Sequence, residues 1–146
     1  MPQRYYFYMT SFLVSSDIYR NTHYGGKHPL NIPRVGATLD LIKAMSWYDE
    51  AKFITAPIAK PSLLKKFHSN DYINVLIEVD EKQEIDKNQS NKYNLGTPSN
   101  PIFKGMYKRP ATSVGGSVVA AEFAFLHGRA FNLGGGLHHG LSLIHI

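Results

Sequence analysis

Two adjacent histidines, His138 and His139, directly follow three glycines near the C-terminus. Histidine is the side chain best suited to moving protons near neutral pH, and glycine lets the main chain approach a ligand closely. Neighbouring residues in an extended chain point to opposite faces, and the ligands of a zinc site are usually separated in sequence. Both observations disfavour the binding of one metal ion by His138 and His139 together. The pattern indicates two imidazoles beside a substrate, one acting as general base and the other as its acid or electrostatic partner.

The elements that must position this pair alternate between strands and helices. Residues 130–133 form a short apolar segment that predicts a strand leading into the glycines. Further strands are expected at residues 4–15 and 53–55, and helices from Pro33, over 61–67, from a Ser69 cap, and from Tyr107 or Pro110 to Gly128. This alternation predicts one α/β domain.

Two of the expected helices carry apolar residues at helical spacing, which predicts buried faces. These stripes are Val35, Leu39, Ile42 and Met45 in the first helix, and Val114, Val118, Ala121 and Phe125 in the last. The small residues between positions 115 and 121 would let the last helix pack closely on a sheet. Residues 17–29 are expected to form a long polar loop, and residues 80–94 an exposed helix tail and loop.

Composition excludes several classes of protein. The chain has 146 residues, of which 43% are hydrophobic and 18% charged, as in one globular domain. Its net charge of +5 is dispersed, with the densest cluster at Lys60, Lys65 and Lys66, so a nucleic-acid partner is not expected. The absence of cysteine excludes disulfides and thiolate metal sites and permits the cytoplasmic location that we expect. No apolar run reaches the length of a membrane span, and the N-terminus lacks the features of a signal peptide.

Five segments in order along the chain carry a family resemblance. They are HPLNIPRV (28–35), FHSNDYINVL (67–76), YNLGTPSNPIFKGMY (93–107), GGSVVAA (115–121) and NLGGGLHHG (132–140). Together they strongly resemble the histone deacetylase family, and especially its bacterial acetoin-utilization branch. The resemblance covers about residues 15–140. It implies an arginase/deacetylase-like fold, which is a three-layer α/β/α arrangement with a parallel sheet.

The resemblance also implies a reaction, namely zinc-dependent hydrolysis of an N-acetyl amide such as acetyl-lysine. An amide is a poor electrophile, so a Lewis acid must polarise its carbonyl and lower the pKa of the attacking water. In the family the histidine pair flanks this water, and we expect His139 to be the general base and acid, with His138 as its electrostatic partner. Arg34 matches a family arginine near a channel thought to release acetate, although it could instead only brace loops. We expect Gly136 to contact the substrate.

One departure from the family pattern concerns the substrate. Many members have an aspartate that anchors the substrate backbone where this chain has Ser99. A serine can accept a hydrogen bond but carries no charge, so peptide anchoring should weaken. The expected substrate is therefore an acetylated protein or a small acetylated amine.

A second departure concerns the metal. The family's zinc ligands, two aspartates and a histidine, and its transition-state tyrosine lie downstream of the histidine pair, whereas this sequence ends seven residues after His139. We therefore expect residues 1–140 to be the N-terminal part of a single deacetylase domain that holds no zinc and is inactive by itself. Residues 141–146, LSLIHI, match a translation of CTG TCT CTT ATA CAC ATC, a sequencing-library adapter, and are expected to be a non-native tail.

Three alternatives come from other classes. A non-catalytic binding or regulatory fragment would keep the surface of the same fold without its metal. A basic nucleic-acid-binding domain would show binding that weakens steeply with salt, but the sequence has no aromatic-basic stripe to support it. An acyltransferase of the HHxxxDG type is excluded because residues 140–146 contain no aspartate.

Overall fold

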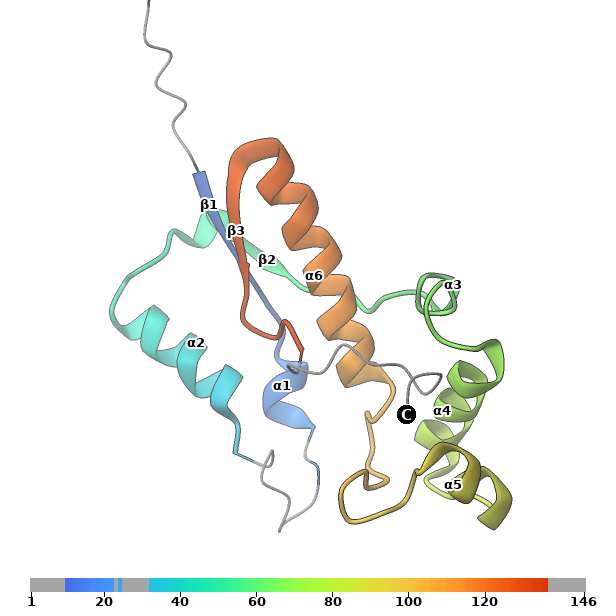
Figure 1. The fold of residues 1–146 in the computed structure, drawn as a ribbon. Helices are drawn as coiled ribbons and strands as arrows, with labels where there is room; N and C mark the ends of the chain where they lie inside the picture. The colour runs from blue at the N-terminus through green and yellow to red at the C-terminus, as the bar shows by residue number, and fades with distance from the viewer. Residues whose placement is uncertain (1–9, 23, 25–31, 137–146) are drawn as a thin grey trace, which may run out of the picture.

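A three-stranded parallel sheet lies at the centre of the fold (Figure 1). The structure is a computed structural model and describes residues 10–22, 24 and 32–136. The strands are β1 (Thr10–Ser15), β2 (Phe53–Thr55) and β3 (Gly128–Asn132), in the order β2-β1-β3. Leu13 of β1 pairs with Phe53 on one side and with Phe131 on the other. The predicted strands are confirmed within the described residues, and positions 4–9 of the first lie outside them.

Helices connect and cover these strands. They are α1 (Ile18–Asn21), α2 (Arg34–Ala44), α3 (Pro61–Leu64), α4 (Asn70–Lys82), α5 (Lys87–Tyr93) and α6 (Lys108–His127), with a short 3-10 turn η2 (Glu50–Lys52). Figure 1 shows α2 and α6 on opposite sides of the strands, while α3, α4 and α5 form a separate group beyond α6. The predicted α/β/α layering with a parallel sheet is confirmed. None of the helices within the described ranges is both long enough and apolar enough to cross a membrane.

The helix α6 packs on the sheet through its smallest residues. Ala120 joins Val14 and Ala56 in a buried cluster between helix and sheet. A Cβ atom added at Gly115 would overlap the carbonyl oxygen of Pro57, and one added at Gly116 would crowd Ala56. The absence of side chains at these two positions therefore sets how closely helix and sheet approach.

The prediction of which face of α6 is buried was wrong. Val114 and Val118 are each 37% exposed, and Phe125 is 90% exposed. The buried residues of α6 are instead Ala111, Thr112, Gly115, Gly116 and Ala120. The larger apolar side chains Val114, Val118 and Phe125 therefore lie outside the buried face of the helix.

The stripe predicted for α2 was only partly right. Leu39 is buried at 3% exposure, but Met45 is 52% exposed. Gly36, rather than an apolar side chain, forms the rest of the buried face, and a Cβ there would lie 2.8 Å from Cγ of Arg20. The contact between α1 and α2 is therefore made over a glycine.

A second apolar cluster holds α4 and α5 together. It consists of Val75, Leu76, Val79, Tyr93, Leu95 and Met106. Ser69 caps α4 as predicted, because its side chain accepts a hydrogen bond from the backbone N–H of Tyr72. The prediction of a loop up to residue 94 was wrong, since the side chain of Asp86 accepts from two N–H groups and starts α5. The loop predicted over residues 17–29 likewise contains the short helix α1.

Candidate active-site turn

The glycine segment begins as a turn at the carboxyl end of β3. The N–H of Leu133 still donates to the carbonyl oxygen of Val14 at 3.0 Å, so the chain stays beside β1 until it turns. Leu133 and Gly134 form the turn, and Gly135 and Gly136 follow. Ligand sites of parallel α/β sheets lie at the carboxyl ends of the strands, so this turn occupies the expected edge for chemistry.

Asn132 ties the turn to α6. Its Oδ1 atom accepts a hydrogen bond from the N–H of Gly134 at 3.1 Å. Its Nδ2 atom donates to the carbonyl oxygen of Ser113 at 3.2 Å and to Oγ of Ser117 at 3.1 Å. A Cβ added at Gly116 would lie 2.9 Å from Nδ2. The lack of a side chain at Gly116 therefore leaves room for the amide group of Asn132. One side chain therefore satisfies polar groups on both the helix and the turn.

Tyr19 binds the other backbone polar group of Gly134. Its hydroxyl donates to the carbonyl oxygen of Gly134 at 3.4 Å and lies 3.3 Å from Oγ of Ser113. The residue is only 3% exposed. Burial raises the pKa of Tyr19, and this outweighs the hydrogen bond from Ser113 and the charge of Arg109, which both lower it. The hydroxyl therefore remains protonated and able to donate at neutral pH.

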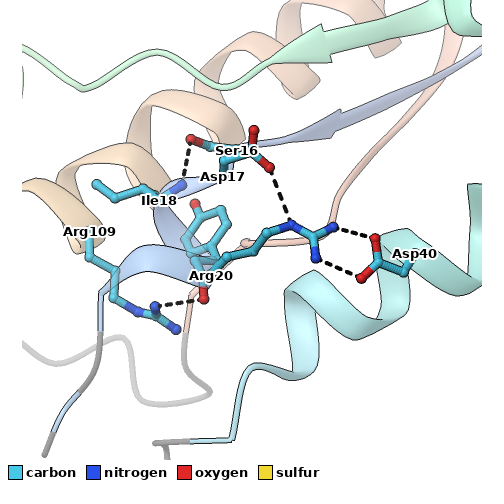
Figure 2. Close-up of polar contacts among 7 residues, drawn as sticks. Ser16, Asp17, Ile18, Arg20, Asp40 and Arg109 are labelled. Carbon is cyan, nitrogen blue, oxygen red and sulfur yellow. Dashed lines mark hydrogen bonds and ion pairs between the residues drawn. The ribbon is translucent and has the colours of Figure 1, made fainter.

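Arg109 holds the segment that carries Tyr19. Its Nη1 atom donates to the carbonyl oxygens of Tyr19 at 3.2 Å and Thr22 at 3.0 Å, and to Oγ1 of Thr22 at 3.0 Å. The guanidinium carbon also lies 5.3 Å from the ring centre of Tyr19 and 5.2 Å from that of Tyr24. Figure 2 shows Arg109 reaching from α6 toward α1. Since last-turn carbonyls of a helix lack intrahelical partners, a cation there stabilises the end of α1.

A second arginine joins α1 to α2. Nη1 and Nη2 of Arg20 donate to the two carboxylate oxygens of Asp40 at 2.6 and 2.7 Å, and Nε donates to Asp17 at 3.3 Å (Figure 2). The hydrogen bonds from Arg20 lower the pKa of Asp40 below its usual range, and the same bonds raise the pKa of Arg20. This bidentate pair links α1 to α2, the helix that begins with Arg34.

The sequence-predicted site residues come from several segments. Gly136 is exposed and ends the described turn with a φ of +97°, a backbone conformation that favours glycine. Arg34 is exposed at the first residue of α2. Ser99 is exposed in the turn between α5 and α6, where its Oγ lies 3.3 Å from Oγ1 of Thr97. His138 and His139 lie outside the described residues.

Sequence reasoning missed the residues that hold the turn. Asn132 carried a usable signal, because an asparagine just before glycines often accepts from a backbone N–H two residues later. Tyr19 and Arg109 carried none, since the contact of Tyr19 with the turn and that of Arg109 with Tyr19 each span many residues of sequence.

A zinc site needs several nitrogen, sulfur or carboxylate ligands in one place. Among residues 10–22, 24 and 32–136, no three histidine, cysteine, aspartate or glutamate side chains come together in a way that could hold a metal ion. The described residues therefore do not fit the zinc site that the family resemblance implies.

Comparison with known proteins identifies the family. The family model of the histone deacetylase domain matches residues 28–143, a range that includes α2 to α6, β2, β3 and the glycine turn. The chain belongs to the histone deacetylase family. Among curated relatives, it is 34% identical over 134 residues to the acetoin utilization protein AcuC of Bacillus subtilis, and 34% identical over 134 residues to histone deacetylase HDAC1 of Drosophila melanogaster. The predicted membership of this family is confirmed.

Solved structures agree with this assignment. The fold is similar to that of a histone deacetylase homologue from Aquifex aeolicus, with a TM-score of 0.84 and 37% identity, and to a homologue in complex with SAHA with the same values. Each match covers 90% of this chain and 36% of the solved chain. The chain covers 34% of the length of the Bacillus AcuC and 25% of the Drosophila enzyme. This deacetylase-family chain therefore spans about a third or less of the relatives it matches.

Proposed function

We propose that this chain is the N-terminal part, residues 1–140, of a domain that hydrolyses an N-acetyl amide. The observation that supports this most is the family match over residues 28–143, because it includes the glycine turn at the carboxyl end of β3 and the two histidines beyond it. The reducing cytoplasm, where we propose that the protein acts, suits a chain with no cysteine.

The proposed roles of this chain concern proton transfer and substrate contact. His139 takes a proton from the attacking water and returns one to the leaving amine, and His138 stabilises the charge that develops. Gly136 has no side chain, so the main chain at that point can approach the substrate closely. The family's metal is zinc, which supplies Lewis-acid chemistry when bound. Since the described residues do not fit a zinc site, its ligands would have to come from elsewhere in the complete protein.

The substrate class is an acetylated amine, carried on a protein or on a small molecule. Ser99 is exposed and its hydroxyl lies beside that of Thr97, so it offers a neutral hydrogen-bonding group where many relatives have a carboxylate. A charged hydrogen bond is about twice as strong as a neutral one, so we expect weaker retention of a peptide backbone here. The replacement of the carboxylate by serine should weaken the binding of a small acetylated amine less than that of a peptide.

The test uses a fusion that completes the domain. Residues 1–140 are joined to the downstream part of the Bacillus AcuC, and deacetylation is assayed on an acetyl-lysine peptide and on a small acetylated amine. We expect turnover by the fusion, none by the 146-residue chain, and a loss of about 100-fold or more in kcat in a His139→Ala fusion, because general acid–base catalysis contributes at least that much. Turnover that persists after replacement of both His138 and His139 would contradict the proposal.

A binding role without catalysis is the second candidate. The observation that favours it is the apolar surface that the end of α6 leaves open, with Phe125 90% and Leu126 69% exposed. Apolar patches of this kind often mark interaction sites. An inactive fusion that is nevertheless folded would favour this role over deacetylation.

A further inference from the structure

We propose that Tyr19, itself held by Arg109, is a positioning residue for the glycine turn that leads to the histidine pair. The catalytic role of the histidine pair is taken from the proposed function, and this is the only part of the inference that rests on it. The contacts themselves, and the experiment below, are independent of any activity.

The first argument is that Tyr19 fixes Gly134 in two separate ways. Its hydroxyl donates to the carbonyl oxygen of Gly134 at 3.4 Å, and its ring lies where a Cβ of residue 134 would be. Asn132 holds the N–H of the same residue. Both polar groups of one glycine are therefore bound by side chains, although glycine by itself has the least restricted backbone. Such a doubly bound glycine is expected where the direction of the following chain matters.

The second argument is that Arg109 holds Tyr19 through several contacts. Arg109 donates to the carbonyl oxygen of Tyr19 and to both oxygens of Thr22, and its guanidinium lies against the Tyr19 ring. Arg109 belongs to the first turn of α6, while Tyr19 follows β1. The start of α6, the segment after β1 and the turn after β3 are thus connected through one tyrosine.

The third argument concerns the reaction. Gly134 precedes His138 by four residues, and the direction in which the chain leaves the turn limits where the imidazoles can lie. A misplacement of about 1 Å in catalytic groups can reduce a rate by about 100-fold. A tyrosine that touches no substrate can therefore still matter for proton transfer, through the backbone that it holds.

The experiment measures hydrogen exchange by mass spectrometry on the 146-residue chain at low concentration. The variants are Tyr19→Phe, which keeps the ring and removes the hydroxyl, and Tyr107→Phe, a matched control whose ring packs against the α4 and α5 cluster. Exchange is compared in a peptide that covers residues 128–140 and in a peptide from α4. We expect Tyr19→Phe to speed exchange in the first peptide by about fivefold, because one hydrogen bond is lost, with no change in α4. The control should leave residues 128–140 unchanged.

A second pair of variants keeps the test decisive if Tyr19→Phe does not fold. Arg109→Met removes the donors, and Arg109→Lys keeps a positive charge and a donor at the same site. We expect faster exchange over residues 128–140 in Arg109→Met and partial rescue in Arg109→Lys, since a lysine cannot reproduce the planar guanidinium. Unchanged exchange of the turn in folded variants, or an equal rise in α4, would overturn the proposal.

Discussion

The ring of Tyr19 occupies the space that a side chain on Gly134 would need, and its hydroxyl donates to the carbonyl oxygen of that same glycine. Shape and hydrogen bonding therefore act on one residue at the start of the turn. The two residues are 115 positions apart in sequence, so the contact brings the exit of β1 to the exit of β3. In a deacetylase-family chain this is the point from which the histidine pair is reached.

This relationship makes Gly134 intolerant of a larger residue. We expect Gly134→Ala to destabilise the chain by roughly 1–3 kcal/mol, because the added methyl group has to displace a buried ring. The matched control is Gly135→Ala, whose Cβ would lie 3.3 Å from the carbonyl oxygen of Asn132 and needs only a small adjustment. Chemical denaturation measures both variants, and equal stability for the two would show that Tyr19 does not restrict residue 134.

The contact between α6 and the segment that follows β2 predicts a reversed effect of alanine in a helix. In an open helix Gly→Ala stabilises by about 1 kcal/mol. At Gly115 the new methyl group would overlap the carbonyl oxygen of Pro57, so we expect Gly115→Ala to lower the free energy of unfolding. Glu122→Ala, on the exposed face of the same helix, is the control and should change stability little. A more stable Gly115→Ala variant would mean that helix and sheet are farther apart than described.

The layout of the fold could be predicted from sequence because its signals are local. The strand at 53–55, the Ser69 cap and the end of the last helix at Gly128 were all predicted from short patterns, and the structure has each of them. The family segments then gave the overall fold, which the comparisons confirm.

The burial of α6 could not be predicted in the same way. Val114, Val118 and Phe125 have the spacing of a core face, and periodicity alone favours burying them. The structure instead buries a face made of small residues, where Gly115 and Gly116 allow a close contact that periodicity does not reveal. The contacts of Tyr19 and Arg109 were equally hidden, because they form only after distant segments are assembled.

The pairing of Arg20 with Asp40 predicts a dependence on acid. The hydrogen bonds from Arg20 lower the pKa of Asp40 in the folded chain. The contribution of this pair to stability is therefore fully present above the pKa that Asp40 has in the unfolded chain. It is lost as the pH falls through the lower pKa of Asp40 in the folded chain. We expect Asp40→Asn to lower the thermal midpoint at neutral pH, with the difference from the unmodified chain shrinking in acid. Glu122→Gln is a control on α6. Because the pair is exposed, added salt should weaken the effect, and a salt-independent difference would point to packing instead.

The exposed apolar side chains predict self-association. Phe125 is 90% exposed at the end of α6, close in sequence to Leu126 at 69%. We expect Phe125→Lys to raise the solubility of the chain without lowering its free energy of unfolding, because the phenyl ring is not part of the core. Light scattering during concentration, combined with denaturation, measures both quantities. A loss of stability in Phe125→Lys would show that this ring packs against the rest of the chain.

The residue at position 99 predicts how substrate preference can be shifted. In the fusion that completes the domain, Ser99→Asp would restore the carboxylate found in many relatives. We expect this variant to lower the KM for an acetyl-lysine peptide by several-fold, because charge-assisted hydrogen bonds to a peptide backbone are stronger. The KM for a small acetylated amine should stay the same, since that substrate has no backbone to anchor. Thr97→Asp, two residues earlier in the same turn, controls for the added charge. A fall in KM for both substrates, or for both variants, would mean that the charge acts on the whole site and that Ser99 does not mark the peptide-anchoring position.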